Sequence, residues 1–328
     1  MRAWHWAQRI ERGHPLRRFA PSPSLASPEG DDILAARRLL LDVSELDRAG
    51  FRRGSTSREF VVSQEFLRPL SELRTPVKLL GVLTDIDDTL TTDGVVPEHV
   101  VAAIARLKDA GLKVVPITGR PVGWSVPFAS AWPVDAIVAE NGAVALRRNA
   151  EGSLDKLYQQ SADERARNFA RMQQVLEQIE ATVPGARRAT DSAGRECDIA
   201  VDHSEFTNMP QAQIDECVAI MKAAGMNATV SSIHINGWFG EHNKLEGARW
   251  ITRELFDIDL DATLARWVYI GDSTNDQQMF EHMPHSVGVA NIARFVPQLR
   301  HLPRYVTTAE RGDGFVQLAD QLLAPQKQ

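Results

Sequence analysis

The sequence contains little cysteine: only Cys197 and Cys217 occur in 328 residues. Two cysteines are too few for a disulfide framework, and neither lies in the Cys-x-x-Cys or close Cys/His spacing typical of a zinc site. We therefore expect both to be small, buried apolar side chains in a protein of a reducing compartment.

Long apolar runs are also missing. The apolar runs, such as residues 39–41 and 136–139, fall far short of a membrane span. Residues 1–20 are rich in arginine but lack the continuous apolar stretch of a secretory signal. The sequence therefore predicts a cytoplasmic protein with no membrane partner.

A surplus of positive charge is absent as well. The net charge is -6, and beyond residue 76 there are 33 acidic against 24 basic residues. An acidic body argues against nucleic acid as a partner. The shares of apolar residues (43%) and charged residues (24%) are typical of a globular protein. Nothing in the sequence identifies a protein partner.

The first 76 residues differ in character from the rest. Residues 1–30 combine four prolines with interleaved serines, which is typical of a loop or tail, and residues 33–48 could form an amphipathic helix. We interpret residues 1–76 as a partly disordered N-terminal extension of unknown function.

Alternating strands and helices begin at Val77. A near-continuous apolar run ending in acids indicates a strand that is buried on both faces, and the elements that follow continue a βαβαβ series. The predicted strands are 77–87, 113–120, 136–141, 265–273 and 286–291, and the predicted helices are 97–110, 243–255, 274–282 and 314–323. This order predicts a doubly wound, Rossmann-like parallel sheet.

The interval between the two halves has its own pattern. It contains a long amphipathic helix through Phe169 and Ile179, a strand at 196–203, a helix around Ile214 and a strand at 228–235. We predict an α/β cap, residues 146–239, inserted into a catalytic core of residues 77–145 and 240–328.

Polar residues follow the predicted core strands, where parallel sheets bind ligands. They are Asp85, Asp87, Asp88 and Thr89; Thr118, Gly119 and Arg120; Glu140 and Asn141; and Gly271, Asp272, Ser273, Asn275 and Asp276. Converging acids repel one another unless a cation lies among them, and oxygen ligands favour Mg²⁺. Because Mg²⁺ commonly recruits substrate phosphate oxygens, the pattern predicts phosphoryl chemistry.

Each residue type suits one step of that chemistry. Asp85, at the strand tip, is the predicted nucleophile, and Asp87 is the predicted general acid and base. Lys244 and the Thr118 hydroxyl can hold the phosphoryl group.

With these residues the sequence resembles the haloacid dehalogenase-like hydrolase superfamily, in its magnesium-dependent phosphatase branch. Four motifs occur in order: Asp85-Ile-Asp87-Asp88-Thr89-Leu90, Thr118 in ITGR, Lys244 in HNKLEGA, and Gly271-Asp272-Ser273-Thr274-Asn275-Asp276. The resemblance implies Mg²⁺ ligands from the Asp85 carboxylate, the Asp87 backbone carbonyl and Asp272, with Asp276 close by.

Motif spacing identifies the branch. Thr118 follows Asp85 by 33 residues, whereas Lys244 follows Thr118 by 126, so the cap lies between the second and third motifs. This arrangement resembles sucrose-, trehalose- and mannosylglycerate-phosphate phosphatases and phosphomannomutases. One departure is Asp88, where that branch commonly has glycine.

Further residues are candidates for binding phosphate or substrate: Gly119, Arg120, Asn141 and Asn275. Arg120 either reaches substrate or pairs with a carboxylate at the domain junction, and Glu140 and Asn141 suit a turn at the cap hinge. In the cap, His203, Glu205, His234, Asn236 and Trp238 are individually more typical of structural positions. We retain His234 and Trp238 as candidate specificity residues, because aromatic and polar groups suit sugar hydroxyls.

The predicted function is a Mg²⁺-dependent phosphomonoester hydrolase for a small, sugar-like phosphorylated metabolite, acting through an aspartyl phosphate. A phosphomutase and a catalytically silent binding or regulatory module remain alternatives. A dehalogenase is disfavoured, because that chemistry has no need of the acid at Asp87.

Overall fold

The protein is described from a computed structural model, which covers residues 66–75 and 77–325. The helix predicted at residues 33–48 and most of the predicted N-terminal extension lie outside these residues. Within the covered part of the chain, no helix is long and apolar enough to cross a membrane.

A six-stranded parallel sheet forms the centre of the larger unit, in the order β1-β12-β11-β10-β2-β3. Its strands are β1 (Arg68–Pro69), β2 (Gly81–Thr84), β3 (Lys113–Pro116), β10 (Trp267–Gly271), β11 (Ser286–Gly288) and β12 (Tyr305–Val306). Strands β2 and β3 wind to one side and β10 to β12 to the other. The order therefore reverses between β2 and β10, and ligands of such sheets bind beyond the strand ends at this point.

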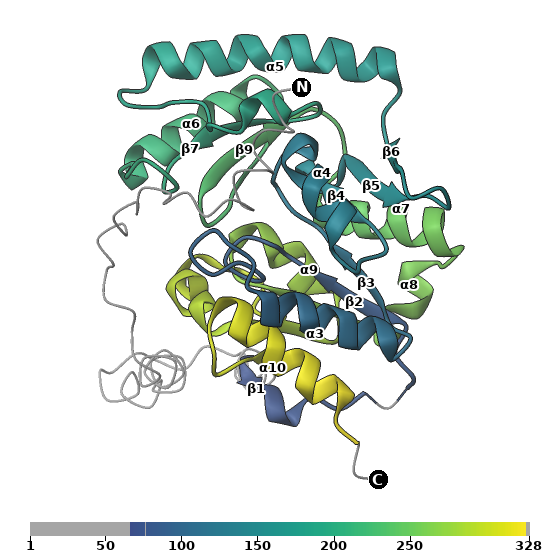
Figure 1. Ribbon diagram of the computed structural model, residues 1–328. Coiled ribbons are helices and arrows are strands. Elements are labelled where there is room, and N and C mark those ends of the chain that lie inside the picture. Colours follow the sequence, from purple (N-terminus) through teal and green to yellow (C-terminus); the bar gives the residue numbers. More distant parts are fainter. Residues whose placement is uncertain (1–65, 76, 326–328) are drawn as a thin grey trace, which may run out of the picture.

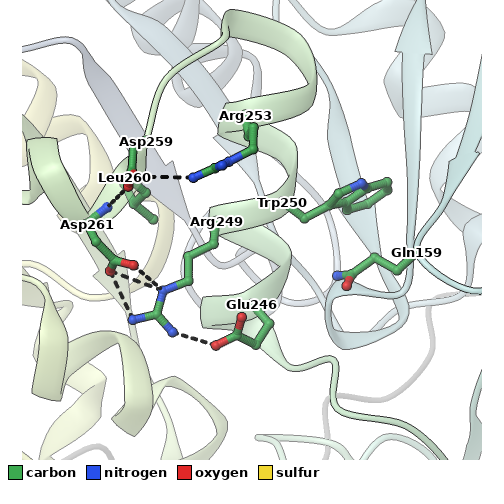
Figure 2. A pocket seen from close by; sticks show the side chains of 8 residues that line it. All are labelled: Gln159, Glu246, Arg249, Trp250, Arg253, Asp259, Leu260 and Asp261. Carbon is green, nitrogen blue, oxygen red and sulfur yellow. Dashed lines mark hydrogen bonds and ion pairs between the residues drawn. The ribbon is translucent and has the colours of Figure 1, made fainter.

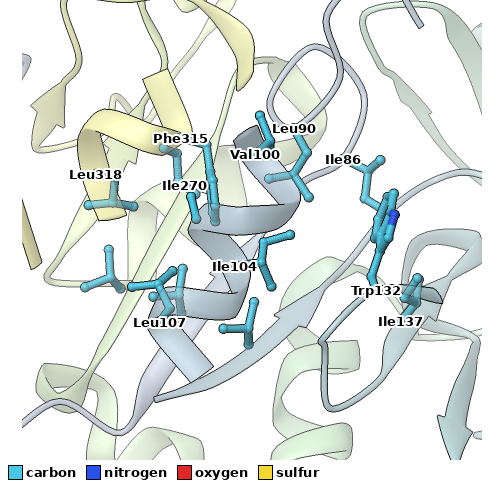
Figure 3. Packing of buried hydrophobic residues seen from close by; sticks show 14 of the residues in the cluster. Ile86, Leu90, Val100, Ile104, Leu107, Trp132, Ile137, Ile270, Phe315 and Leu318 are labelled. Atoms are coloured by element: carbon cyan, nitrogen blue, oxygen red, sulfur yellow. The ribbon is translucent and has the colours of Figure 1, made fainter. Parts of the chain in front are cut away.

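Helices cover both faces of this sheet (Figure 1). One face carries α3 (Glu98–Asp109) and α10 (Arg311–Leu323), and the other carries α7 (Lys244–Phe256), α8 (Leu260–Thr263), α9 (Gln277–His282) and the 3₁₀ segment η8 (Ala290–Gln298). Helix α4 (Val122–Ala131) belongs to the same hydrophobic cluster as α3 and α10 but packs mainly on a second, three-stranded sheet. Neighbouring strand residues alternate between the faces, so Val82 and Leu83 belong to different hydrophobic clusters. Figure 3 shows the first cluster, with Ile104 of α3 near Phe315 of α10. The predicted doubly wound sheet is confirmed.

The edge strand β1 lies in a segment that we assigned to the N-terminal extension. Leu67 and Arg68 donate backbone hydrogen bonds to the carbonyls of Pro303 and Arg304, both at 2.9 Å. A two-residue strand is too short to show a period of two, and its proline is tolerated because it lies at an edge. The parallel sheet therefore begins before Val77.

A three-stranded sheet, β4 (Ile137–Ala139), β5 (Val144–Arg148) and β6 (Leu154–Tyr158), extends the core. A parallel bridge between Ile117 and Val138 joins it to the sequence after β3. Val144 and Ala145 are buried in the two core clusters. Residues 146–158, which we assigned to the cap, therefore continue a sheet that packs with the catalytic unit.

The cap has its own hydrophobic core, which includes Met172, Leu176 and Ile235. Helices α5 (Ala162–Thr182) and α6 (Gln211–Ala223) pack on an antiparallel sheet of β7 (Ile199–Asp202), β9 (His234–Trp238) and β8 (Asn227–Val230), seen at the top of Figure 1. The single strand predicted at 228–235 is a hairpin. Its turn forms because the Ser231 hydroxyl accepts the His234 N–H at 3.0 Å.

Five short 3₁₀ segments complete the described elements: η3 (Leu70–Glu72), η4 (Glu140–Gly142), η5 (Ser192–Gly194), η6 (Leu264–Arg266) and η7 (Thr274–Asp276). Of these, η4 follows β4 and η7 follows β10, so both lie just beyond strand ends of the catalytic unit.

Candidate active site

Three acids predicted from the motifs meet beyond β2 and β10. Asp85 directly follows β2, and its backbone N–H donates to the carbonyl of Ile270 at 2.9 Å. Asp272 directly follows β10. Carboxylate oxygens of Asp85, Asp272 and Asp276 lie within 4.8 Å of one another, and all three residues are buried. The topological switch point therefore carries a compact carboxylate cluster.

Lys244 provides a positive charge inside this cluster. Its helix α7 begins there because the Asn243 side chain caps the first turn. The Lys244 ammonium lies 2.8 Å from Asp85 and 2.6 Å from Asp276. Burial alone would lower the pKa of Lys244, but the two carboxylates outweigh it and raise the pKa above its usual range. Burial raises the pKa of Asp85, which the Lys244 charge opposes.

Asp276 is fully engaged in hydrogen bonds. One of its oxygens accepts from Lys244 and from the Tyr269 hydroxyl. The other accepts the backbone N–H groups of Asp272 at 2.9 Å and Ser273 at 3.0 Å. Because each oxygen already accepts two donors, Asp276 braces the loop after β10 and orients Lys244.

Asp272 differs, because one of its carboxylate oxygens (Oδ1) is buried and has no hydrogen-bond partner among residues 66–75 and 77–325. The other oxygen accepts from Asn291 at 3.3 Å and Arg294 at 3.4 Å. Burial, together with the nearby charges of Asp88 and Asp85, raises the pKa of Asp272 well above its usual range. A buried acceptor without a partner is costly, and a divalent cation beside Asp85 and Asp272 would satisfy it. The residues present fit such an ion.

Asp87 faces the second motif. One of its oxygens lies 2.9 Å from the Arg120 guanidinium, and the other accepts the Thr118 hydroxyl at 3.4 Å. The Thr118 hydroxyl in turn accepts the backbone N–H of Arg120 at 3.0 Å. Strands β2 and β3 are neighbours in register, which brings these two motifs together.

Arg120 connects the catalytic unit to the cap. Besides Asp87, its guanidinium lies 2.9 Å from Glu205 and 3.3 Å from Asp191, both cap residues. Glu205 also lies 2.7 Å from the ring of His234. Of the two roles expected for Arg120, the structure shows the ion pairs at the domain junction.

The remaining core candidates lie near these groups. The Gly119 carbonyl accepts from Asn236 of the cap at 3.3 Å. A Cβ at Gly119 would lie 3.2 Å from the Asn141 and Asn236 side chains, a tight contact to which these side chains would have to yield by a few tenths of an ångström. Asn275 accepts from Lys244 at 3.3 Å. Gly119, Asn141 and Asn275 therefore border the space between the motifs.

The two cap candidates differ in position. His234 is buried and joins the Arg120 network through Glu205. Trp238 lies in the cap core, only 2% exposed, and its indole N–H donates to the carbonyl of His242 at 2.7 Å. This packing role replaces the predicted substrate contact of Trp238.

Glu140 is the main junction residue whose partners the sequence did not reveal. Its buried carboxylate accepts the backbone N–H of Val122 and those of three consecutive cap residues, Glu196, Cys197 and Asp198. The expected role at the cap hinge is thus carried by hydrogen bonds from cap backbone to a core carboxylate. No local pattern marks residues 196–198 as its partners.

A pocket on the outer side of α7 is separate from these groups (Figure 2). Its charged residues pair with one another: Arg249 with Glu246 and Asp261, and Arg253 with Asp259. None of the predicted site residues lines it.

Comparison with known proteins finds sequence similarity to hydrolases, and among them to phosphatases. Residues 82–182 match the family described as haloacid dehalogenase-like hydrolase. A phosphoglycolate phosphatase of Methanosarcina mazei is 27% identical over 248 residues, which are 75% of this chain and 97% of the relative.

Solved structures share the fold. A Thermoplasma acidophilum protein, 17% identical, superposes with a TM-score of 0.58 over 75% of this chain and 99% of its own. The sucrose-phosphatase of Synechocystis, solved with sucrose and phosphate and 16% identical, superposes with a TM-score of 0.55 over 76% of this chain and 100% of its own. The architecture of core and cap is therefore shared across the whole length of these structures.

Proposed function

We propose that this phosphatase, which is similar to the haloacid dehalogenase-like hydrolases over residues 82–182 and to phosphoglycolate phosphatases over most of its length, is a Mg²⁺-dependent hydrolase of a small, sugar-like phosphomonoester. The observation that carries the proposal is the convergence of four motifs at one end of the sheet. Asp85 lies 2.8 Å from Lys244, and Asp87 is held by Thr118 and Arg120.

Asp85 and Asp87 divide the reaction into two steps. The Asp85 carboxylate attacks phosphorus and the bond to the leaving oxygen breaks, while Asp87 gives that oxygen a proton. Asp87 then takes a proton from water, which attacks the acyl phosphate and restores Asp85. The proton balance closes, because Asp87 loses one proton and regains one.

Mg²⁺ would be held by Asp85 and Asp272, and the family resemblance adds the backbone carbonyl of Asp87. When bound, it would offset negative charge on the carboxylates and on the substrate phosphate. The partnerless oxygen of Asp272 supports this assignment. The engaged carboxylate of Asp276 supports a bracing role for that residue.

The phosphoryl group would be positioned by Lys244, Thr118, Gly119 and Asn275. The ammonium offers a charged donor, and the hydroxyl, the backbone N–H and the side-chain amide offer neutral ones. Asn141 lies against Gly119 and would border the same space.

The cap face supports a hydroxyl-bearing substrate. Near Asp87 it presents the carboxylates of Asp191 and Glu205 with the ring of His234, and carboxylate and imidazole groups suit sugar hydroxyls. Arg120 is already surrounded by carboxylates, which leaves little positive charge for a second anionic group. Phosphoglycolate is the second candidate substrate, favoured by the name of the Methanosarcina relative.

Two other functions are weaker candidates. A phosphomutase would use the same nucleophile and return the phosphoryl group to the sugar, but the sequence relatives are phosphatases. A silent binding module would not need both Asp85 and Asp87 beside Lys244 and Thr118.

A screen of the purified full-length protein against sugar phosphates, phosphoglycolate and an aryl phosphate, with and without Mg²⁺, tests the proposal. We expect Mg²⁺-dependent release of free phosphate, fastest with a sugar phosphate. Isomerised sugar phosphate in place of free phosphate would select the mutase. No turnover of any compound would overturn the proposal.

A further inference from the structure

Asp88 is the position at which the first motif departs from the glycine common in the resembling branch. Its backbone has a φ of 54°, a left-handed conformation that favours glycine and that aspartate and asparagine also tolerate. The side chain is held by arginines: Arg294 lies 2.7 Å from one carboxylate oxygen, and Arg311 lies 3.3 Å from the other. The carboxylate at this position is thus part of a charge network.

Arg294 reaches from Asp88 to the carboxylate cluster. The same nitrogen, Nη2, that lies 2.7 Å from Asp88 lies 3.4 Å from Oδ2 of Asp272. The Arg294 side chain is 42% exposed, whereas Asp272 is fully buried. A partly exposed guanidinium therefore lies beside a fully buried acid of the site.

The oxygen of Asp272 that faces Arg294 is not the free one. Oδ2 takes the contacts from Arg294 and from the amide of Asn291, while Oδ1 has no partner in the part of the chain that the structure describes. Asn291 also donates to the backbone carbonyl of Asp88 at 3.0 Å, so the two loops are tied together. The shorter contact to Asp88 keeps the Arg294 guanidinium on the side of Asp272 away from Oδ1.

We propose that the Asp88–Arg294 ion pair sets the affinity of the carboxylate cluster for a divalent cation. Arg294 competes with the cation by electrostatic repulsion, and Asp88 is a positioning residue that limits this competition by holding Arg294. This inference rests on the proposed function, because it assumes that the cluster holds a cation.

Opposite changes in cation affinity follow from the two partners. Removing the charge with Arg294→Gln should tighten Mg²⁺ binding by about tenfold, since a half-exposed charge within several ångströms of a divalent ion is only partly screened. Asp88→Asn keeps the shape and tolerates the left-handed backbone. It should weaken Mg²⁺ binding by about threefold or more, because Arg294 then pairs with Asp272 alone.

The two substitutions should not be additive. If Asp88 acts through Arg294, Asp88→Asn should change the dissociation constant by less than about twofold when Arg294→Gln is already present. A general effect of the Asp88 charge on the site would instead give equal changes in both backgrounds.

Calorimetric titration of Mg²⁺ into the full-length protein and these variants tests the inference without relying on turnover. Arg294→Lys keeps the charge and should bind like the wild type. Arg188→Gln is the matched control, because Arg188 is 43% exposed and paired with Glu180 in the cap. It should change the dissociation constant by less than about twofold.

The Mg²⁺ titrations distinguish failure of this inference from failure of the proposed function. Unchanged or weaker Mg²⁺ binding by Arg294→Gln, or equal effects of Asp88→Asn in both backgrounds, would overturn the inference while leaving the cation site intact. Absence of Mg²⁺ binding by the wild type would instead refute the cation site of the proposed function. If Asp88→Asn fails to fold, Arg294→Gln still tests whether the Arg294 charge weakens cation binding, because this side chain is 42% exposed and its replacement leaves no cavity in the core.

Discussion

The acids of the carboxylate cluster fall into two groups: those with an oxygen available to coordinate a cation, and those whose oxygens are used in hydrogen bonds that brace the site. Among the described residues, one buried oxygen of Asp272 has no hydrogen-bond partner, whereas both oxygens of Asp276 accept hydrogen bonds. Because their hydrogen-bond partners differ, we expect these two acids, four residues apart in one motif, to have different roles.

Asp272→Ala should raise the Mg²⁺ concentration needed for half-maximal activity by about tenfold or more, because a ligand oxygen is lost. Asp313→Ala, at a 71% exposed position, is the control and should leave the titration unchanged. A Mg²⁺ titration of phosphate release measures both. An unchanged requirement in Asp272→Ala would remove this residue from the ligand set.

Glu205 gives the junction a pH dependence. Burial would raise its pKa, but hydrogen bonds and charges from His234 and Arg120 outweigh it and lower the pKa from 4.5 to about 2. The stabilisation is therefore complete above about pH 4.5 and is lost as the pH falls towards 2.

Glu205→Gln should make the free energy of unfolding depend less on pH in the acid range. We expect the wild type to lose about 1–2 kcal/mol more than the variant between pH 5 and pH 2, after allowance for solvent screening. Urea denaturation at several pH values measures the difference. Parallel pH profiles for the two proteins would show that this ion pair does not couple folding to protonation.

Candidate site residues could be proposed from the sequence where their motif is local. Asp85, Asp272 and Thr118 could be found because each follows an apolar strand within a short motif. The partners of Arg120 could not, since Asp191 and Glu205 lie 71 and 85 positions away on another unit. Asn291 could have been named as a candidate site residue from the sequence, because it lies shortly after β11, much as Asp272 lies after β10.

At the scale of elements, the close packing of α7 against η4 sets the position of Lys244. A Cβ at Gly247 would lie 2.6 Å from the backbone of Gly142. Gly142 has a φ of 110°, so it also needs to be glycine. The helix can approach the turn after β4 only because both residues lack a side chain.

Gly247→Ala should push α7 outwards. We expect a loss of about 1–3 kcal/mol in unfolding free energy from overpacking and a fall in kcat, because Lys244 lies one turn earlier on the helix. Gly225→Ala is a control whose φ of 79° gives strain with no atom within 4 Å.

Urea denaturation and kcat are to be measured together for both glycine variants. Gly225→Ala should lose stability and keep its kcat. If Gly247→Ala is destabilised but turns over at the wild-type rate, the packing of α7 does not position the lysine.

Elements with a strong apolar period were predicted correctly, and those defined by tertiary contacts were not. The helix predicted at 97–110 is α3, with Val100, Ile104 and Leu107 buried. The strand predicted at 228–235 contains a turn at Ser231, because side-chain hydrogen bonds there replace the ladder. The edge strand β1 owes its conformation to pairing with β12, a partner more than 230 residues away.

For the whole molecule, the cap and the catalytic unit meet through polar contacts around the strand ends. Besides the bonds of Glu140 and Arg120, Arg195 and Asn236 of the cap donate to the Gly119 carbonyl, and Thr274 donates to the carbonyl of Val230. Such contacts hold the cap against the carboxylate cluster and would limit access of bulk water during phosphoryl transfer.

The insertion itself was predictable from motif spacing, because 126 residues separate Thr118 from Lys244. Its boundary was not. Strands β5 and β6 form a separate three-stranded sheet with β4, yet β5 packs into the catalytic unit through Val144 and Ala145. Only the three-dimensional packing shows where one unit ends.

The central claim, that Asp85 is the covalent nucleophile, is tested most directly by trapping the intermediate. The full-length protein is mixed with an aryl phosphate and Mg²⁺, quenched in acid within milliseconds, and digested for mass spectrometry, with Asp85→Asn as the control. We expect one phosphoryl group on the peptide that contains Asp85, formed as fast as the phenol burst, and none in the variant. Two results would contradict the account: turnover by the wild type without a phosphorylated Asp85 peptide, or undiminished turnover by Asp85→Asn.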